Sequence, residues 1–163
     1  MQELRARAVV QAATQADLVV LGGIWQELMT LHEERDHHFA LAPDALRRWR
    51  EMAEEMLLRG DAFVFKATFA GTTVGFCLGW VAVNPAIYRR SEVGFISEIA
   101  VRRRWQRHGV GRALVAQARR WFHAHGLDEF QLSTAIWNDA AHHFWEKVGG
   151  KRLLVRYRFD TEG

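Results

Sequence analysis

The stretch that most constrains the fold is residues 96–113, which read I-S-E-I-A-V-R-R-R-W-Q-R-H-G-V-G-R-A. Residues 95–101 are rich in aromatic and β-branched side chains and have the length of a strand. A strand that leads into a helix through a turn leaves backbone N–H groups unpaired at the positive end of the helix dipole. The stretch therefore predicts a binding site for phosphate groups. The helix after the turn is indicated by apolar side chains at helical spacing, at Val110, Leu114, Ala118 and Phe122.

The turn itself, residues 102–111, is basic and contains two glycines. Gly109 and Gly111 have no Cβ, so the backbone can approach a bound phosphate closely. A polyanionic ligand would explain why the positive charge of the chain, which is +3 overall, concentrates in this turn. Neither end of the sequence carries an arm rich in lysine and arginine, so nucleic acid is not an expected partner. The positive side chains are Arg102, Arg103, Arg104, Arg107, His108 and Arg112.

Two motifs resemble those of one known family. Residues 106–111, Q-R-H-G-V-G, fit the (Gln/Arg)-x-x-Gly-x-(Gly/Ala) signature with which GCN5-related N-acetyltransferases (GNATs) hold the pyrophosphate of acetyl-CoA. Residues 138–149 resemble the second signature of the family, Asn-x-x-Ala-x-x-(aromatic)-Tyr followed by Gly-Phe. A glycine turn also occurs in dinucleotide-binding oxidoreductases. That alternative is disfavoured, because the turn comes late in the chain and Asp139 is poorly placed to bind a ribose.

The composition indicates one globular domain, residues 1–163. Apolar residues make up 49% and charged residues 25% of the sequence, as in folded proteins. No apolar run reaches the ~18 residues of a membrane span, and the first residues lack the apolar core of a signal peptide. The one cysteine, Cys77, lies in an apolar run and is expected to be a buried hydrophobic residue. A cytoplasmic protein with no membrane segment is therefore expected.

Hydrophobic periodicity and turn residues predict the α/β order β-α-α-β-β-β-α-β-α-β. The order matches the GNAT fold over nearly the whole chain. The resemblance implies a mixed central sheet of about six strands with four helices, in which the parallel strands ending at Val101 and Trp137 splay apart. The predicted strands are residues 5–12, 63–69, 73–83, 95–101, 130–137 and 153–159, and the predicted helices are residues 15–34, 43–59, 110–125 and 139–148.

The resemblance implies that acetyl-CoA is the cosubstrate and that its acyl-pantetheine arm enters the gap between the two splayed strands. The residues that it assigns to the cofactor lie at the end of the strand before the turn, in the turn, and on the last helix. They are Ile99, Ala100, Val101, Gln106, Arg107, His108, Gly109, Val110, Gly111, Arg112, Asn138, Phe144 and Trp145.

The second motif departs from the family at two positions. Trp145 stands where the family has Tyr, and Gly150 stands where it has Phe. The family's Tyr often protonates the departing CoA sulfur, whereas an indole N–H donates a hydrogen bond but is no general acid near neutral pH. An alkyl thiol has a pKa of about 8.5, so its thiolate can leave without full protonation. Trp145 is expected either to stabilise that thiolate or to pack against the pantetheine.

The candidate bases for deprotonating an amine are Glu98 and Ser97. In a regular strand, alternation places Ser97, Phe95 and Ile99 on one face and Glu98 on the other. A bulge in this strand, which is common in the family, would change that parity, so both residues stay candidates. Glu98 has an equally simple alternative role as an ion-pair partner of a nearby arginine. The thioester carbonyl is expected to be polarised by a backbone N–H near Ile99 or Ala100.

The acceptor amine is expected to bind over the first helix, the loop that follows it and the loop after Asn84. That region offers aromatic and acidic side chains that suit a cationic amine. The alternative is that Trp25 and Met29 belong to the core and that the charged residues form a solvated surface. The candidate acceptor-binding residues are Trp25, Met29, His32, Glu33 and Asp36.

These features together predict an acetyl-CoA-dependent N-acetyltransferase that acetylates a primary amine, of a small molecule or a peptide, by direct attack in a ternary complex. The alternative is a non-catalytic acyl-CoA-binding or regulatory module, which Trp145 favours. No metal is expected, because adjacent histidines on a helix, such as His142 and His143, point away from each other, and no Cys partner or His-Glu-x-x-His spacing accompanies the pairs. Dimers are frequent among GNATs, so the resemblance also implies a homodimer in which the last strand can supply an edge.

Overall fold

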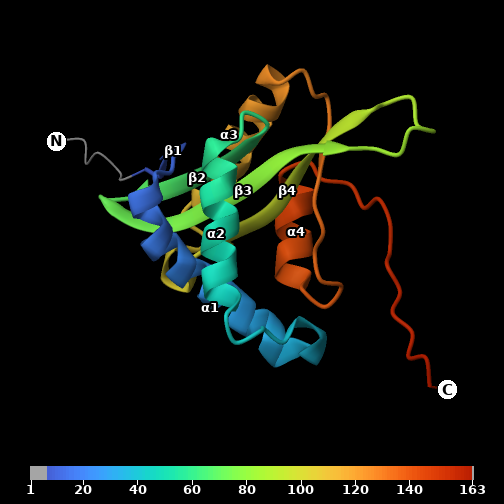
Figure 1. Ribbon diagram of the computed structural model, residues 1–163. Coiled ribbons are helices and arrows are strands. Elements are labelled where there is room, and N and C mark those ends of the chain that lie inside the picture. Colours follow the sequence, from blue (N-terminus) through green and yellow to red (C-terminus); the bar gives the residue numbers. More distant parts are fainter. Residues whose placement is uncertain (1–6, 163) are drawn as a thin grey trace. The chain divides into compact units, whose positions relative to one another are not determined.

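The computed structural model describes residues 7–162. These residues fall into two compact units, with the boundary between Leu132 and Ser133. The first unit contains all strands assigned within the described residues, and the second contains one α-helix, α4 (Asp139–Lys147) (Figure 1). The strands are β1 (Val9–Ala12), β2 (Ala62–Phe69), β3 (Thr72–Val83), β4 (Glu92–Val101) and β5 (Phe130–Gln131). The other helices are α1 (Leu18–Arg35), α2 (Ala45–Leu58) and α3 (Val110–Ala124), with short 3-10 turns η1 (Gln15–Asp17), η2 (His37–Phe39) and η3 (Arg103–Trp105).

The five strands of the described residues form one mixed sheet in the order β1-β2-β3-β4-β5. The first four strands pair antiparallel with their neighbours, and β5 runs parallel to β4. Parallel pairing requires a crossover, and the segment from η3 through α3 supplies it. The sheet therefore places the predicted strand–turn–helix stretch at the junction of its antiparallel and parallel parts.

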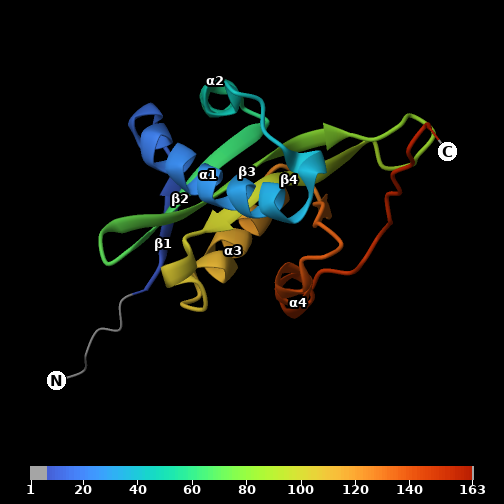
Figure 2. The same ribbon diagram turned by 90° about the horizontal axis from the view of Figure 1, so that it is seen from below.

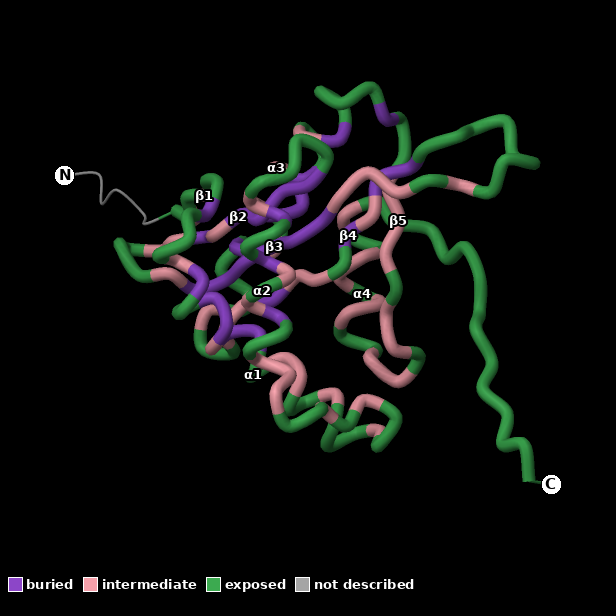
Figure 3. Tube along the Cα trace, in the orientation of Figure 1, coloured by how far each residue is buried: buried purple, intermediate pink, exposed green. Residues whose placement is uncertain are grey.

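Helices cover both faces of the sheet. Seen from below in Figure 2, α1 and α2 lie on one side of the strands and α3 lies on the other. Each face has its own apolar core, and the buried segments run along the central strands in Figure 3. The core under α1 and α2 includes Leu21, Trp25, Trp49, Phe76 and Leu78. The core under α3 includes Phe63, Cys77, Ile96, Leu114 and Phe122.

Close packing between β4 and α3 depends on one glycine. A Cβ built on Gly94 would lie 2.6 Å from Cδ1 of Phe122, a side chain that is itself fully buried. Only a residue without a Cβ lets the helix approach the strand this closely. Gly94 therefore lies on the face of β4 against which α3 packs.

The structure corrects the predicted strand content at two places. The predicted strand 130–137 ends at Gln131, and the chain then turns at Ala135, whose carbonyl accepts the N–H of Asn138 at 2.9 Å. The predicted strand 153–159 is not formed, and no helix or strand is assigned to residues 148–162. A strand needs a neighbouring backbone to pair with, and local sequence pattern does not report whether one is present. The described sheet thus has five strands where about six were predicted.

The remaining elements agree with the sequence within a few residues. The first strand was predicted over residues 5–12 and is formed from Val9, and residues 5 and 6 lie outside the described residues. Cys77 is buried and unpaired, as its apolar surroundings predicted. No helix among residues 7–162 is both long and apolar enough to span a membrane.

Candidate active site

The turn between β4 and α3 has the backbone geometry of an anion site. Gly109 is the residue before α3 and has a φ of 81°, and Arg107 has a φ of 67°. The N–H of Ala113 donates to the carbonyl of Gly109 at 3.0 Å. The N–H groups of the residues just before Ala113 have no acceptor within the helix. A Cβ added at Gly109 would meet no protein atom within 4 Å. The N-terminus of this 15-residue helix therefore has room for a phosphate group against its backbone.

Two of the predicted cofactor residues use their side chains to shape this turn. The amide Nε2 of Gln106 donates to the carbonyl of Val101 at 3.1 Å, and Nδ1 of His108 lies 2.8 Å from the carbonyl of Gln106. The imidazole also packs edge-on against Phe69 and Trp105. Side-chain bonds within a turn fix its backbone, so Gln106 and His108 hold the backbone of this turn in place.

The charged side chains of the turn point outward or to a neighbouring helix. Arg107 and Arg112 are exposed at the start of α3. Arg104 places its guanidinium 5.2 Å from the ring centre of Trp105. Arg102 instead turns toward α1, where its Nε lies 3.4 Å from Oε1 of Glu27. Of the basic cluster predicted from the sequence, Arg107 and Arg112 are thus the exposed cations nearest to the helix N-terminus.

The far edge of β4 is open beyond its middle. β5 pairs with β4 only at Gly94 with Phe130 and at Phe95 with Gln131. From Ile96 to Val101, β4 pairs with β3 on one side and with no strand of the described residues on the other. The pairing of β5 with β4 is parallel, as the resemblance implied, and it is limited to these two residue pairs. Backbone groups of Ile99, Ala100 and Val101 lie along this open edge.

A β-bulge at Ser97 resolves which face Glu98 occupies. Opposite β4, Gly79 pairs with Ile96 and Leu78 pairs with Glu98, so Ser97 has no residue across from it. The extra residue shifts the alternation by one position. Glu98 therefore turns toward the core under α1 and α2, on the same face as Ala100, while Ile96 and Ile99 lie on the face covered by α3. Ser97 itself is exposed.

Glu98 is held by two tryptophans. Nε1 of Trp25 on α1 donates to Oε1 of Glu98 at 3.0 Å, and Nε1 of Trp49 on α2 donates to Oε2 at 2.7 Å. Burial raises the pKa of the Glu98 carboxyl above its ordinary value, and the hydrogen bonds from Trp49 and Trp25 act in the opposite direction. The partners of Glu98 are therefore two indoles, where the sequence had suggested an arginine as the alternative. Trp49 was not among the predicted site residues, because nothing in the sequence links its position on an apolar helix stripe to Glu98.

The predicted acceptor-binding residues separate into two groups. Trp25 is buried in the core with 6% of its surface exposed. The others lie along the second half of α1 and its end, where the side chain of His32 contacts the carbonyl of Leu28 at 2.9 Å and its ring packs edge-on against Phe39. Asp36 accepts the N–H of His38 at 2.9 Å. Met29 is partly buried against the same core as Trp25, and Glu33 is exposed.

The second unit carries the predicted motif on α4. Asn138 caps this helix, since its Oδ1 accepts the N–H of Ala141 at 3.1 Å. The rings of Phe144 and Trp145 meet edge-to-face with centres 4.9 Å apart. Gly149 follows the helix with a φ of 99°, a left-handed conformation that ends helices. The cap and the helix end agree with the sequence prediction.

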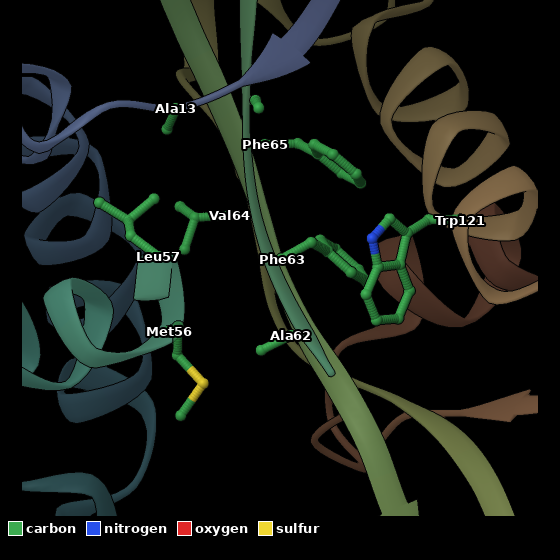
Figure 4. Close-up of a pocket in the computed structure, with 9 residues that line it drawn as sticks. Ala13, Met56, Leu57, Ala62, Phe63, Val64, Phe65 and Trp121 are labelled. Atoms are coloured by element: carbon green, nitrogen blue, oxygen red, sulfur yellow. The ribbon is translucent and has the colours of Figure 1, made fainter. Parts of the chain in front are cut away.

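A cavity lies in the first unit. It has a volume of about 270 Å³ and opens beside β2, where β2 extends past the end of β1. In Figure 4 the side chains of Met56, Leu57 and Val64 lie on one side of the strand, and those of Phe63 and Trp121 lie on the other. Its lining contains no carboxylate, imidazole or hydroxyl. Among residues 7–162, no three His, Cys, Asp or Glu side chains gather in a way that would hold a metal ion.

Comparison with known proteins gives a family and a fold. None of the curated proteins matches the chain. Aminoglycoside N-acetyltransferase AAC(6')-Iy in complex with CoA superposes with a TM-score of 0.77 at 18% identity, covering 97% of each chain. AAC(6')-IG from Acinetobacter haemolyticus gives 0.74 at 18% identity, covering 94% of this chain and 98% of that one. A tetramutant of the BH1408 protein from Bacillus halodurans gives 0.81 at 13% identity, covering 93% and 99%.

These likenesses establish that the chain has the GNAT fold, with five strands in the described sheet. The family model described as "Acetyltransferase (GNAT) family" matches residues 24–150, which is more than half of the chain and includes both motifs. The chain therefore belongs to the GNAT family of acetyltransferases.

Proposed function

We propose that residues 1–163 form one acetyltransferase domain that transfers the acetyl group of acetyl-CoA to a primary amine, by direct attack in a ternary complex. The observation that carries this proposal is the open edge of β4, which leads into the unpaired N-terminus of α3 and bears Glu98 on the same strand. A cofactor that lies along β4 with its pyrophosphate on α3 would bring its thioester to the part of the strand that holds a carboxylate.

Acetyl-CoA is the cosubstrate of this reaction. The turn fits its pyrophosphate, because Gly109 leaves the space above the backbone empty and Arg107 and Arg112 are exposed beside it. The open edge of β4 fits the pantetheine, whose amides need the kind of backbone partners that Ile99, Ala100 and Val101 offer. We assign the remaining predicted contacts, from Asn138, Phe144 and Trp145, to the same cosubstrate.

The reaction needs an uncharged amine, and Glu98 is the proposed base. A carboxylate with a raised pKa is a better proton acceptor than an ordinary one, provided that it is still ionised at the working pH. Each of its oxygens has a lone pair beyond the one that faces an indole, so a proton can reach it directly or through water. Ser97, exposed at the bulge, is the second candidate, as a hydroxyl that relays a proton.

The two other parts of the chemistry require no charged side chain. A backbone N–H near Ile99 or Ala100 would polarise the thioester carbonyl and stabilise the negative charge that develops on it. The thiol of CoA, with a pKa of about 8.5, would leave as a thiolate. Trp145 has no ionisable proton for this step, and its proposed role is to pack against the pantetheine or to donate to the sulfur.

The proposed acceptor is a cationic primary amine bound near the second half of α1. Glu33 and Asp36 supply negative charge there, and Met29 and His32 supply apolar and aromatic surface. Two of the similar structures described above are aminoglycoside N-acetyltransferases, so a screen begins with aminoglycosides and polyamines. Peptides with a free N-terminus or a lysine complete the screen, since the GNAT fold hosts many acceptors.

We also propose a homodimer and a cytoplasmic location. Residues 153–159 expose large apolar side chains that a second copy would cover. The single cysteine is buried and unpaired, which suits a reducing compartment.

The alternative function is a non-catalytic module that binds acyl-CoA. One observation favours it. Both oxygens of Glu98 already accept hydrogen bonds from core side chains, as expected of a carboxylate whose role is structural.

The decisive experiment follows release of the CoA thiol from acetyl-CoA with each amine of the screen, for the wild type, Glu98→Gln and Ser97→Ala. Turnover by the wild type that falls by about 10²–10⁴ in kcat/KM in Glu98→Gln, with unchanged affinity for acetyl-CoA, supports Glu98 as the base. A comparable loss in Ser97→Ala alone would transfer that role to Ser97. Tight binding of acetyl-CoA without turnover of any amine would establish the non-catalytic alternative.

A further inference from the structure

Trp25 and Trp49 form a matched pair of donors around one carboxylate. Their rings stack with centres 5.6 Å apart and an angle of 22° between the planes. The stack brings both indole N–H groups to the same side, where each meets a different oxygen of Glu98. The three side chains come from α1, α2 and β4, so the arrangement joins both helices of this face to the sheet.

The donor pair selects an ionised carboxylate. Two N–H groups that face two oxygens require an acceptor at each position, and a carboxylate supplies both. A protonated carboxyl keeps full acceptor strength at only one oxygen, and an amide has only one oxygen. Hydrogen bonds to the charged form stabilise that form. The indoles therefore counteract the burial of Glu98, which favours the protonated form.

The rings are fixed by the core and so can hold the carboxylate in one orientation. Trp49 has 4% of its surface exposed and packs edge-to-face against Phe76 with ring centres 5.5 Å apart. Trp25 belongs to the same buried cluster. Side chains enclosed by a close-packed core stay in one rotamer, and hence the direction of their N–H groups is set before any ligand binds.

Other ionisable side chains lie on the elements around Glu98. The pKa of the Cys77 thiol on β3 is raised by burial and, to a smaller extent, by the negative charge of Glu98. Among the described residues, burial and the two indoles are the causes that act on the pKa of Glu98 itself. Ionisable side chains on these elements include Glu27 on α1, Arg50 on α2, Lys66 on β2, Cys77 on β3 and Arg102 after β4, and none of them is a cause of the pKa shift of Glu98.

We propose that Trp25 and Trp49 are positioning residues, which together keep Glu98 ionised and aim its carboxylate for removing the proton from the acceptor amine. The proposal rests on the function proposed above and gives Trp25 a role other than forming a wall of the acceptor site. It also explains why two large aromatic donors converge on one carboxylate inside an apolar core, where an unpaired charge is costly.

The test uses the indole N–H resonances of the protein in ¹H–¹⁵N spectra, and it requires no turnover. The sequence contains seven tryptophans, which can be assigned by single Trp→Phe variants. In a pH titration, the resonances of Trp25 and Trp49 are expected to move together with one midpoint, and both movements are expected to be lost in Glu98→Gln. In Trp25→Phe, the midpoint reported by Trp49 is expected at higher pH, because the variant removes one hydrogen bond to the ionised form. In Trp49→Phe, the midpoint reported by Trp25 is expected at higher pH for the same reason.

The matched control is Trp121→Phe, which removes an indole from the opposite face of the sheet. It is expected to leave the midpoint of Glu98 in place. The proposal would be overturned if the resonances of Trp25 and Trp49 did not titrate together in the wild type. It would also be overturned if the midpoint were unchanged in Trp25→Phe and Trp49→Phe. The wild-type titration keeps the proposal testable even if one variant fails to fold.

Activity separates this proposal from the function on which it rests. If the chain acetylates amines, the acidic limb of its kcat/KM profile is expected to move to higher pH in Trp25→Phe and Trp49→Phe, but not in Trp121→Phe. A loss of activity that is equal at every pH would mean that the two tryptophans support only the fold. Absence of turnover together with the expected titration would refute the base role of Glu98 and leave its fixation by the indoles standing.

Discussion

Glu98 shows how a partly buried charge is tolerated at the scale of one residue. Moving a carboxylate into an apolar core raises its pKa, because the charged form loses more solvation than the neutral form. Here two indole N–H groups recover part of that loss. Stability therefore depends on pH through Glu98, with a sign opposite to that of the aspartates whose pKa values are lowered.

The first prediction concerns this pH dependence. Because the folded-state pKa of Glu98 lies above its ordinary value, its protonation stabilises the fold below that value, and this contribution is lost as the pH rises through the folded-state pKa. Between the two values, the free energy of unfolding is expected to fall by up to about 1.4 kcal/mol per pH unit. In Glu98→Gln this slope is expected to vanish, as measured by urea unfolding from about pH 4 to about pH 8.

The aspartates provide an internal control for this experiment. Asp17, Asp44 and Asp61 have lowered pKa values, so their contributions are present above the ordinary value and lost as the pH falls. That loss lies below the window of Glu98 and is expected in the wild type and in Glu98→Gln alike. The prediction would be contradicted if, above the ordinary pKa of a glutamate, the free energy of unfolding changed with pH equally in the wild type and in Glu98→Gln. Glu98 would then titrate normally.

At the scale of elements, the parts that sequence predicts well are those decided by local pattern. The helices α1, α2 and α3 were predicted from apolar periodicity, and α4 was predicted from its cap at Asn138 and the glycines after it. Asn138 caps the start of α4, and Gly126, with a φ of 76°, follows the end of α3. The strand–turn–helix stretch was predicted because glycine spacing, basic charge and periodicity all point to one geometry.

The parts that sequence did not settle depend on partners far along the chain. The bulge at Ser97 is set by the pairing of β4 with Leu78 and Gly79, and a pattern within one strand does not report that register. The Trp25–Glu98–Trp49 contact joins residues 73 and 49 positions apart. Residues 153–159 carry a strand pattern, yet no described strand pairs with them, since a pattern states a preference and not a partner.

This last segment matters at the scale of the whole molecule. Five large apolar side chains between residues 153 and 159 are each 61% to 84% exposed. An exposed, strand-like apolar segment is a ready surface for pairing with another chain. A two-fold symmetric pairing of this segment with its copy would cover these side chains in both chains at once.

The corresponding prediction is that the protein has twice the 18.8 kDa mass of one chain when measured by light scattering. Leu153→Asp combined with Val155→Asp is expected to give the single-chain mass, since charges do not pair across an apolar strand contact. Leu58→Asp, at another apolar side chain that is 88% exposed, is the control that should leave the mass unchanged. A wild-type mass of one chain would contradict the proposed dimer.

The turn before α3 is proposed to bind the pyrophosphate of acetyl-CoA, and two glycines allow this assignment to be tested. Gly109 and Gly71 have nearly equal φ values of 81° and 79°, and a Cβ at either would meet no protein atom within 4 Å. Gly109→Ala and Gly71→Ala should therefore impose a similar backbone strain, of about 1–2 kcal/mol. Only at Gly109 would the added methyl group stand in the path of the ligand.

The measurement is the affinity for acetyl-CoA by calorimetric titration of the wild type and both variants. Equal binding by the wild type and Gly71→Ala is predicted, with at least a tenfold loss in Gly109→Ala, which corresponds to about 1.4 kcal/mol. No binding by the folded wild type, or the same affinity in all three proteins, would contradict the assignment of this turn and the proposed mechanism with it.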